Sequence, residues 1–142
     1  MKKSIEIQTG SAAETIAFAE LFSRRLGPGS VLCLQGSLGS GKTTFVKGLA
    51  RGLGLERVDQ VKSPTFVLMH VYRAKVPLYH FDCYRVNSLE ELENIGFEDF
   101  VNDPKAITCV EWAEKASSLI PTRAIGIQFE ILRGPRRRIT IL

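Results

Sequence analysis

A glycine-rich segment constrains this chain more than any other feature. It matches the pattern GxxxxGK[ST] and consists of Gly36, Ser37, Leu38, Gly39, Ser40, Gly41, Lys42 and Thr43, followed by Thr44. The run Val31 to Leu34 before it is continuously apolar, which is typical of a strand buried on both faces. Apolar residues at helical spacing after Lys42 predict an amphipathic helix that ends near Gly52 and Gly54. A strand, loop and helix in this order direct backbone N–H groups at phosphate, so we predict a nucleotide site in an α/β domain.

The residue types in this phosphate loop (residues 36–43) fit that chemistry. Glycines let the backbone approach an anion closely, Lys42 can reach the β and γ phosphates, and the Thr43 hydroxyl can coordinate Mg²⁺. A magnesium site also needs an acid at the end of a neighbouring strand. Two acids qualify: Glu111 closes the run from Ile107 to Val110, and Asp82 closes the run from Leu78 to Phe81.

The expected nucleotide is ATP, with Mg²⁺ as the metal. A Ras-like GTPase would carry an Asn-Lys-x-Asp segment to read the base and an Asp-x-x-Gly segment after a strand, and the sequence contains neither.

Helical and strand periods alternate along the chain, which predicts one P-loop NTPase-like domain over residues 1–142. We expect a mixed, mostly parallel central sheet flanked by helices, with antiparallel hairpins. Predicted helices, besides the one after Lys42, are Ala12 to Arg25, capped by Ser11 with Glu14, and one or two short acidic helices from Ser88 to Phe100, capped by Ser88 with Glu91. Predicted strands, besides Val31 to Leu34, are Phe66 to Tyr72, Val76 to Phe81, Ile107 to Val110, Ala124 to Leu132 and Arg138 to Leu142, with tight connections at 72–76 and 133–136.

Composition indicates an ordered, cytoplasmic protein. Of 142 residues, 44% are hydrophobic and 24% charged, close to the average for globular domains. The three cysteines are widely spaced without a CxxC pattern, which argues against a disulfide framework and a zinc site and favours a reducing compartment. Glu6 interrupts any apolar signal core, and glycines and proline break the longest uncharged run, Leu26 to Gly41, so we expect neither secretion nor a membrane span.

Charge is unevenly distributed along the chain. The net charge is +4, yet the stretch from Val86 to Pro104 holds six acidic residues and no lysine or arginine, which leaves +10 for the remainder. Such a polarised surface suits charged partners, nucleic acid among them, although a solvated helix face is the commoner cause of a run of acids.

Five segments in this order resemble the TsaE family, small bacterial P-loop ATPases required to make threonylcarbamoyladenosine at position 37 of tRNA. They are Gly36 to Thr44, Ser63 to Phe66, Tyr79 to Asp82 with Tyr84-Arg85, Glu90 to Glu93 leading to Gly96, and Val110 to Trp112. The resemblance implies an ATP-hydrolysing partner of TsaB and TsaD that does not itself transfer the threonylcarbamoyl group. Contact with tRNA, direct or indirect, stays open.

The resemblance also implies roles for individual residues. Lys42 would bind phosphate, Thr43 and Glu111 would hold Mg²⁺, and the loops containing Thr65 and Asp82 would act like switch segments near the γ phosphate. Catalysis would then involve Lys42, Thr65 and Asp82, with the Asp82 carboxylate able to orient a water for in-line attack.

Several residues have open roles. Arg133 resembles a family position near the nucleotide. Trp112 is either a core aromatic or a nucleotide or partner contact, and Arg85 can pair with nearby acids, touch phosphate or face a partner. We expect His80, inside an apolar strand, to be buried and hydrogen-bonded.

Two other functions compete with a regulatory ATPase. A small-molecule P-loop kinase would need arginines around the transferred phosphate, and only Arg133 and the run from Arg136 to Arg138 are available for that task. A nucleic-acid-binding module has only the basic carboxyl end in its favour, because the sequence carries no RNA-recognition signature.

Overall fold

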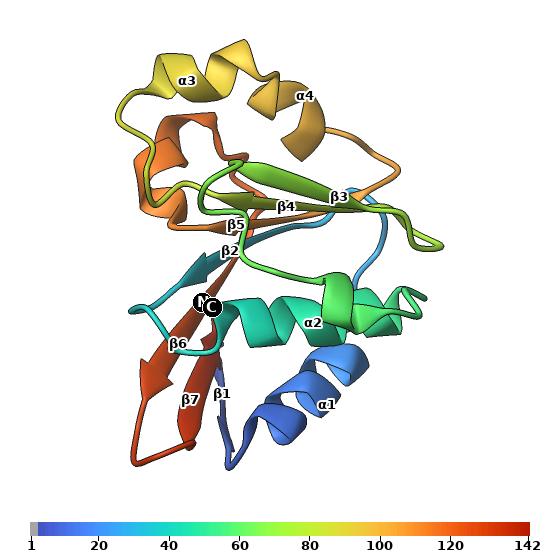
Figure 1. Ribbon diagram of the computed structural model, residues 1–142, viewed down its shortest axis with the longest axis vertical. Coiled ribbons are helices and arrows are strands. Elements are labelled where there is room, and N and C mark those ends of the chain that lie inside the picture. The colour runs from blue at the N-terminus through green and yellow to red at the C-terminus, as the bar shows by residue number, and fades with distance from the viewer. Residues whose placement is uncertain (1–2) are drawn as a thin grey trace.

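One seven-stranded sheet organises the protein, whose computed structural model describes residues 3–142 (Figure 1). The sheet order is β1-β7-β6-β2-β5-β4-β3. The strands are β1 (Ile5–Thr9), β2 (Val31–Gln35), β3 (Met69–Tyr72), β4 (Leu78–Asp82), β5 (Ile107–Glu111), β6 (Ile125–Ile131) and β7 (Arg137–Ile141). The helices are α1 (Ala12–Ser23), α2 (Lys42–Gly52), α3 (Leu89–Asn94) and α4 (Phe97–Val101), with 3-10 helices η1 (Val58–Gln60) and η2 (Ala113–Leu119).

The four central strands β6, β2, β5 and β4 run parallel, and the outer pairs β1–β7, β6–β7 and β3–β4 are antiparallel. The prediction of a mixed, mostly parallel sheet with antiparallel hairpins is therefore confirmed. Both tight connections lie where they were predicted, between β3 and β4 and between β6 and β7. In the second, Gly134 adopts a φ of 58°, which suits a residue without a Cβ.

Helices cover both faces of the sheet (Figure 1). On one face, α1 and α2 pack over a core that includes Leu32, Phe45 and Leu49. On the other, α3, α4 and η2 lie over a second core that includes Phe81 and Phe97. The continuous apolar run of β2 follows from this arrangement, because a central strand covered on both sides exposes neither row of side chains.

The register of the parallel strands brings three strand ends together. Leu34 of β2 pairs with Glu111 of β5, and Glu111 pairs with Asp82 of β4. Because parallel strands share a direction, the chain leaves β2, β4 and β5 at the same edge of the sheet, where α2 begins.

Two strand predictions differ from the structure. β1 was not predicted, and it completes the sheet by pairing with β7. The strand predicted from Phe66 begins only at Met69, because the chain turns there: the N–H groups of Val67 and Leu68 donate to the Pro64 carbonyl and Leu68 has a φ of 73°. Phe66 and Val67 are therefore apolar residues of an exposed loop and not part of a strand; their exposed fractions are 81% and 62%.

The Ser11 side chain caps α1 as predicted, because its hydroxyl accepts from the Glu14 N–H at 3.2 Å. The reciprocal half of the predicted capping box differs: the Glu14 carboxylate accepts from the N–H of Gly10, one residue before the cap, and not from that of Ser11. Ser88 begins α3 but makes no capping hydrogen bond with its side chain, and the Glu91 carboxylate accepts from the Asn87 N–H instead.

The three cysteines are buried free thiols. Burial raises the pKa of Cys33 to about 11 and that of Cys83 to about 12, which makes both thiols poor nucleophiles near neutral pH. Within residues 3–142, every helix is too short or too polar to cross a bilayer.

A glycine in the middle of α2 sets the distance between α2 and α1. A Cβ added at Gly48 would stand 2.3 Å from the Ile16 carbonyl oxygen and 2.5 Å from the Ala19 Cβ. Neither atom belongs to a flexible side-chain end, so the two helices would have to separate to accept it.

We therefore expect Gly48→Ala to destabilise the protein by about 1 to 3 kcal/mol, although alanine is the better helix former by about 1 kcal/mol. Chemical denaturation measures the change in the free energy of unfolding. Gly27→Ala is the matched control, because an added Cβ at Gly27 meets nothing within 4 Å. Equal stability of the two variants would contradict the close helix contact.

Candidate functional site

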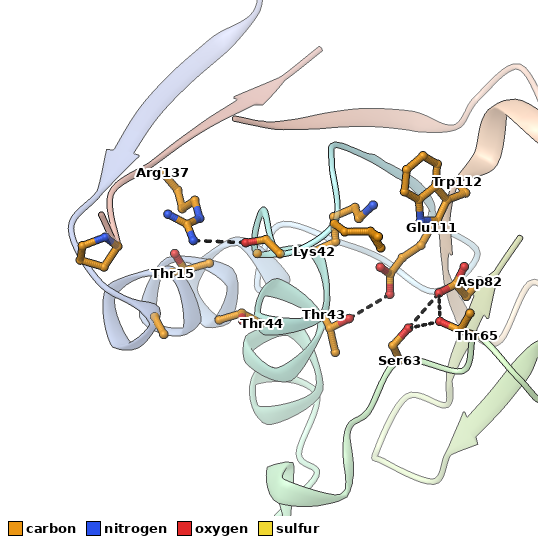
Figure 2. A pocket seen from close by; sticks show the side chains of 15 residues that line it. Thr15, Lys42, Thr43, Thr44, Ser63, Thr65, Asp82, Glu111, Trp112 and Arg137 are labelled. Carbon is orange, nitrogen blue, oxygen red and sulfur yellow. Dashed lines mark hydrogen bonds between the residues drawn. The ribbon is translucent and has the colours of Figure 1, made fainter. Parts of the chain in front are cut away.

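A cavity of about 320 Å³ lies where β2, β4 and β5 end and α2 begins (Figure 2). Its lining comes from five parts of the chain: the start of α1, the phosphate loop with the start of α2, the loop before β3, the ends of β4 and β5, and the β6–β7 turn. Segments distant in sequence thus meet at the edge of the sheet where open α/β sheets bind ligands.

The phosphate loop leaves the N-terminus of α2 available to an anion. Gly41 is the N-cap residue at a φ of 108°, and no side chain caps the helix. A Cβ at Gly36 would stand 2.7 Å from the Phe129 carbonyl oxygen, so glycine is required for the loop to pass β6. The free N–H groups of the first turn and the helix dipole together favour a negatively charged ligand there.

Lys42 lies buried between the loop and Trp112. Its Nζ donates to the Gly36 carbonyl at 2.5 Å and stands 4.0 Å from the centre of the Trp112 ring. Burial lowers the pKa of the Lys42 ammonium, and the carboxylates of Glu111 and Asp82 oppose that shift. The ammonium has no direct carboxylate partner among residues 3–142, so it can form its strongest contact with an incoming anion.

Thr43 and Glu111 place two oxygen atoms side by side next to this lysine. The Thr43 hydroxyl donates to Glu111 Oε2 at 3.3 Å, and the same oxygen lies 2.5 Å from His80 Nε2. Across the described chain, no three His, Cys, Asp or Glu side chains gather as a metal cluster. Two hard oxygen donors at a phosphate site fit Mg²⁺, which usually keeps waters and takes its remaining ligands from phosphate.

Asp82 holds the loop that precedes β3. Its Oδ2 accepts from the hydroxyls of Ser63 at 2.8 Å and Thr65 at 2.7 Å, while Oδ1 accepts from the Tyr84 N–H at 2.8 Å (Figure 2). Both oxygens are thus engaged within the protein. In this conformation Asp82 anchors the loop through three hydrogen bonds, and Oδ1 keeps a lone pair that can accept a further hydrogen bond from a water.

An arginine of the basic run 136–138 lies at the other end of the cavity. Arg137 Nη2 donates to the Gly39 carbonyl at 3.2 Å, near Thr15 of α1 (Figure 2). Arg133 does not line the cavity: it stands on the β6 side of the hairpin turn, and the turn contributes Pro135 and Arg137, on the β7 side, to the lining. The basic run from 136 to 138 was the sequence signal that could have identified Arg137. Thr15, whose hydroxyl lies 2.7 Å from that of Thr9, had no signal in the sequence that could have placed it in the cavity.

Most of the predicted phosphate-site residues line the cavity. Those that do are Leu38, Gly39, Gly41, Lys42, Thr43, Thr44, Thr65, Asp82 and Glu111. Gly36, Ser37 and Ser40 form the turn of the loop outside the lining.

The residues with open roles are now placed. Trp112 lines the cavity and also packs against the second core. The Arg85 guanidinium stacks 4.2 Å over the exposed Phe66 ring, and within residues 3–142 it makes no ion pair. His80 is fully buried and bonded to Glu111, as predicted.

Comparisons with known proteins agree on one family. Residues 9–139 match the family model described as "Threonylcarbamoyl adenosine biosynthesis protein TsaE". The chain is 40% identical to the tRNA threonylcarbamoyladenosine biosynthesis protein TsaE of Treponema pallidum, over 92% of this chain and 95% of that one. It is 38% identical to the Bacillus subtilis protein of the same name, over 97% and 85%. The crystal structure of Bacillus subtilis YdiB superposes with a TM-score of 0.82 at 34% identity, covering 99% of this chain and 86% of that one.

The contact between Lys42 and the single tryptophan provides an optical test of the site. A polyphosphate drawn to the N-terminus of α2 should attract the ammonium away from Trp112, so we expect ATP or ADP to change the tryptophan fluorescence. Lys42→Ala should weaken nucleotide binding roughly 10- to 100-fold, since a charged hydrogen bond contributes about 1.5 to 3 kcal/mol.

Lys47→Ala is the control, because Lys47 lies on the same helix but outside the cavity. Calorimetry of nucleotide binding and circular dichroism of the fold complete the comparison. Wild-type affinity in a folded Lys42→Ala protein would contradict the proposed phosphate contact.

Proposed function

Because this chain belongs to the TsaE family, whose members are described as tRNA threonylcarbamoyladenosine biosynthesis proteins, we propose that it is the ATP-hydrolysing component of that modification system. It would act with TsaB and TsaD in the cytoplasm and would not transfer the threonylcarbamoyl group itself.

One observation carries the ATPase proposal. Lys42, Thr43 and Glu111 converge at the open N-terminus of α2, with Thr43 Oγ1 and Glu111 Oε2 3.3 Å apart. A lysine, a hydroxyl and a strand-end carboxylate around free helix N–H groups are the parts that phosphoryl-transfer sites use for positioning and charge stabilisation.

The two ends of the cavity suggest the direction in which ATP lies. The β and γ phosphates would occupy the Lys42 end, next to Glu111. The ribose and base would extend past Thr44 toward Thr15 and Arg137, at the opposite end of the cavity (Figure 2). The two acids of the lining, Asp82 and Glu111, stand at the end proposed for the metal and the phosphates, and Arg137 stands at the end proposed for the base.

Thr43 and Glu111 would hold Mg²⁺. The bound metal would neutralise charge on the transferred phosphate. The protein's own contribution would be to keep those two oxygens beside Lys42 and, through Asp82, to hold the 61–68 loop over the reacting end.

The position of the arginine in the cavity supports the proposal that hydrolysis depends on partner proteins. Arg137 is the one arginine among the cavity-lining residues of the described chain, and it lies away from the Glu111 end. Charge that develops on the γ phosphate would therefore need a further cation, which in P-loop enzymes can be supplied by a partner with a gain of roughly a thousandfold or more. For docking we propose the acidic stretch from Glu90 to Asp103, which follows β4 and the anchored loop closely in the chain.

Substitution of the two acids separates their proposed roles. Glu111→Ala should raise the Mg²⁺ concentration needed for hydrolysis more than it weakens metal-free nucleotide binding. Asp82→Ala should depress turnover with a smaller loss of binding, because it frees Ser63 and Thr65 without removing a phosphate contact. Mg²⁺ titrations of ATPase activity and calorimetry measure both effects. Glu56→Ala is the control, because Glu56 is an exposed acid outside the cavity. The reverse pattern would show that the roles are misassigned.

Partner dependence is tested by titrating TsaB and TsaD from the same source into the protein while ATP hydrolysis is followed. We expect slow turnover alone and acceleration by the complex. A variant with Glu90, Glu91 and Glu93 changed to lysine should bind the complex more weakly. An ATPase rate that does not change when TsaB and TsaD are added would refute activation by the partners. Unchanged complex formation by the lysine variant would refute the docking surface. Phosphorylation of an added hydroxyl compound would favour the kinase alternative.

A further inference from the structure

The Glu111 carboxylate has two protein contacts, and one of them has no part in the chemistry proposed so far. Oε2 faces the Thr43 hydroxyl at 3.3 Å and His80 Nε2 at 2.5 Å. His80 is fully buried and does not line the cavity, so it cannot touch a bound nucleotide. Within residues 3–142, its hydrogen bond to the cavity lining is the one to Glu111.

The hydrogen-bond partners of the imidazole define its tautomer. A carboxylate can only accept, so Nε2 must carry the hydrogen that bridges to Glu111. Nδ1 is buried without a partner among the described residues. A lone pair on Nδ1 would leave no buried N–H group unsatisfied, so the hydrogen-bond partners place the ring hydrogen on Nε2.

The imidazole is also held in place from behind. Its ring packs against Tyr72 of β3, with centroids 6.3 Å apart, and β4 fixes its backbone between β3 and β5. The Tyr72 hydroxyl in turn bonds the backbone of Lys62, at the start of the 61–68 loop. His80 therefore has little freedom to follow Glu111, and Glu111 must adapt to His80.

We propose that His80 is a positioning residue for the metal site: its Nε2–H holds the Glu111 carboxylate beside the Thr43 hydroxyl and thereby sets the affinity for Mg²⁺. This inference rests on the proposed role of Thr43 and Glu111 as magnesium ligands. Hydrogen bonds to ligating side chains orient them, and their loss typically lowers metal affinity about 10- to 100-fold.

Two substitutions separate the hydrogen bond from the volume of the ring. His80→Leu fills the site without a donor, whereas the amide of His80→Gln can replace Nε2–H. We expect His80→Leu to raise the Mg²⁺ concentration that half-maximally enhances ADP binding by about 10- to 100-fold, with metal-free ADP affinity within about twofold of wild type. His80→Gln should recover most of this loss.

Calorimetry with ADP gives this result without turnover. His70→Leu is the matched control, because His70 pairs with His80 across the strands and, within residues 3–142, makes no hydrogen bond to Glu111. Glu111→Ala serves as the reference. If Glu111→Ala shifts the Mg²⁺ requirement and His80→Leu does not, the positioning role alone is refuted; equal defects in both His80 variants would also refute it. If Glu111→Ala has no effect, the proposed metal site fails, and the inference fails with it.

A measurement on the unaltered protein covers the case in which His80→Leu does not fold. The chain has two histidines, so ¹⁵N NMR of the rings needs few assignments. We expect His80 to be protonated on Nε2, with a hydrogen that exchanges slowly, and its Nε2 shift to move when Mg²⁺ and ADP are added together. A ring hydrogen on Nδ1 would overturn the proposal, and so would an Nε2 chemical shift that stays unchanged when Mg²⁺ and ADP are added.

Discussion

The parallel pairing of β2, β5 and β4 is the arrangement on which the other features of the site depend. Hydrogen bonds between these strands place Leu34, Glu111 and Asp82 in one row at the edge of the sheet. The phosphate loop leaves from one end of that row, the carboxylate of Glu111, the proposed metal ligand, stands in the middle, and Asp82, which anchors the 61–68 loop, stands at the other end. A one-residue shift of β5 would turn Glu111 to the opposite face of the sheet, away from Thr43.

Burial explains why this row can carry polar groups. Glu111, Asp82 and His80 are all nearly inaccessible to solvent, and each has hydrogen-bond partners within the protein. A buried carboxylate without such partners would destabilise the fold by several kcal/mol. The same contacts that satisfy these groups therefore also fix their orientation, so stability and the geometry of the proposed site depend on the same hydrogen bonds.

The helices α1 and α2 and the 61–68 loop also constrain the shape of the cavity. Gly48 allows α2 to approach α1 closely, and α1 carries Thr15 into the cavity. On the far side, Tyr72 and Asp82 hold the 61–68 loop at its start and near its middle. Phe66 and Val67 remain exposed between the anchored part and β3, with Arg85 stacked on Phe66. The proposed reacting end of the cavity is thus bordered by a loop that is held at defined points while its apolar tip faces solvent.

Local sequence determined the parts of this protein whose structure depends on neighbouring residues. The phosphate loop, the buried strand before it, the helix after it and the two hairpin connections follow from glycine spacing, apolar period and turn residues, and a motif of this kind carries its own geometry. The strand-end acids Glu111 and Asp82 could also be identified, because parallel strands end at one edge of a sheet. Only the tertiary structure decided that Asp82 binds Ser63 and Thr65. It also decided that Arg137 and not Arg133 lines the cavity, and that Thr15 reaches the cavity. The pairing of β1 with β7 belongs to the same group of outcomes. These outcomes depend on strand order, on the direction of a hairpin and on the close approach of two helices, and contacts between residues far apart in the chain leave no periodic signal in the sequence.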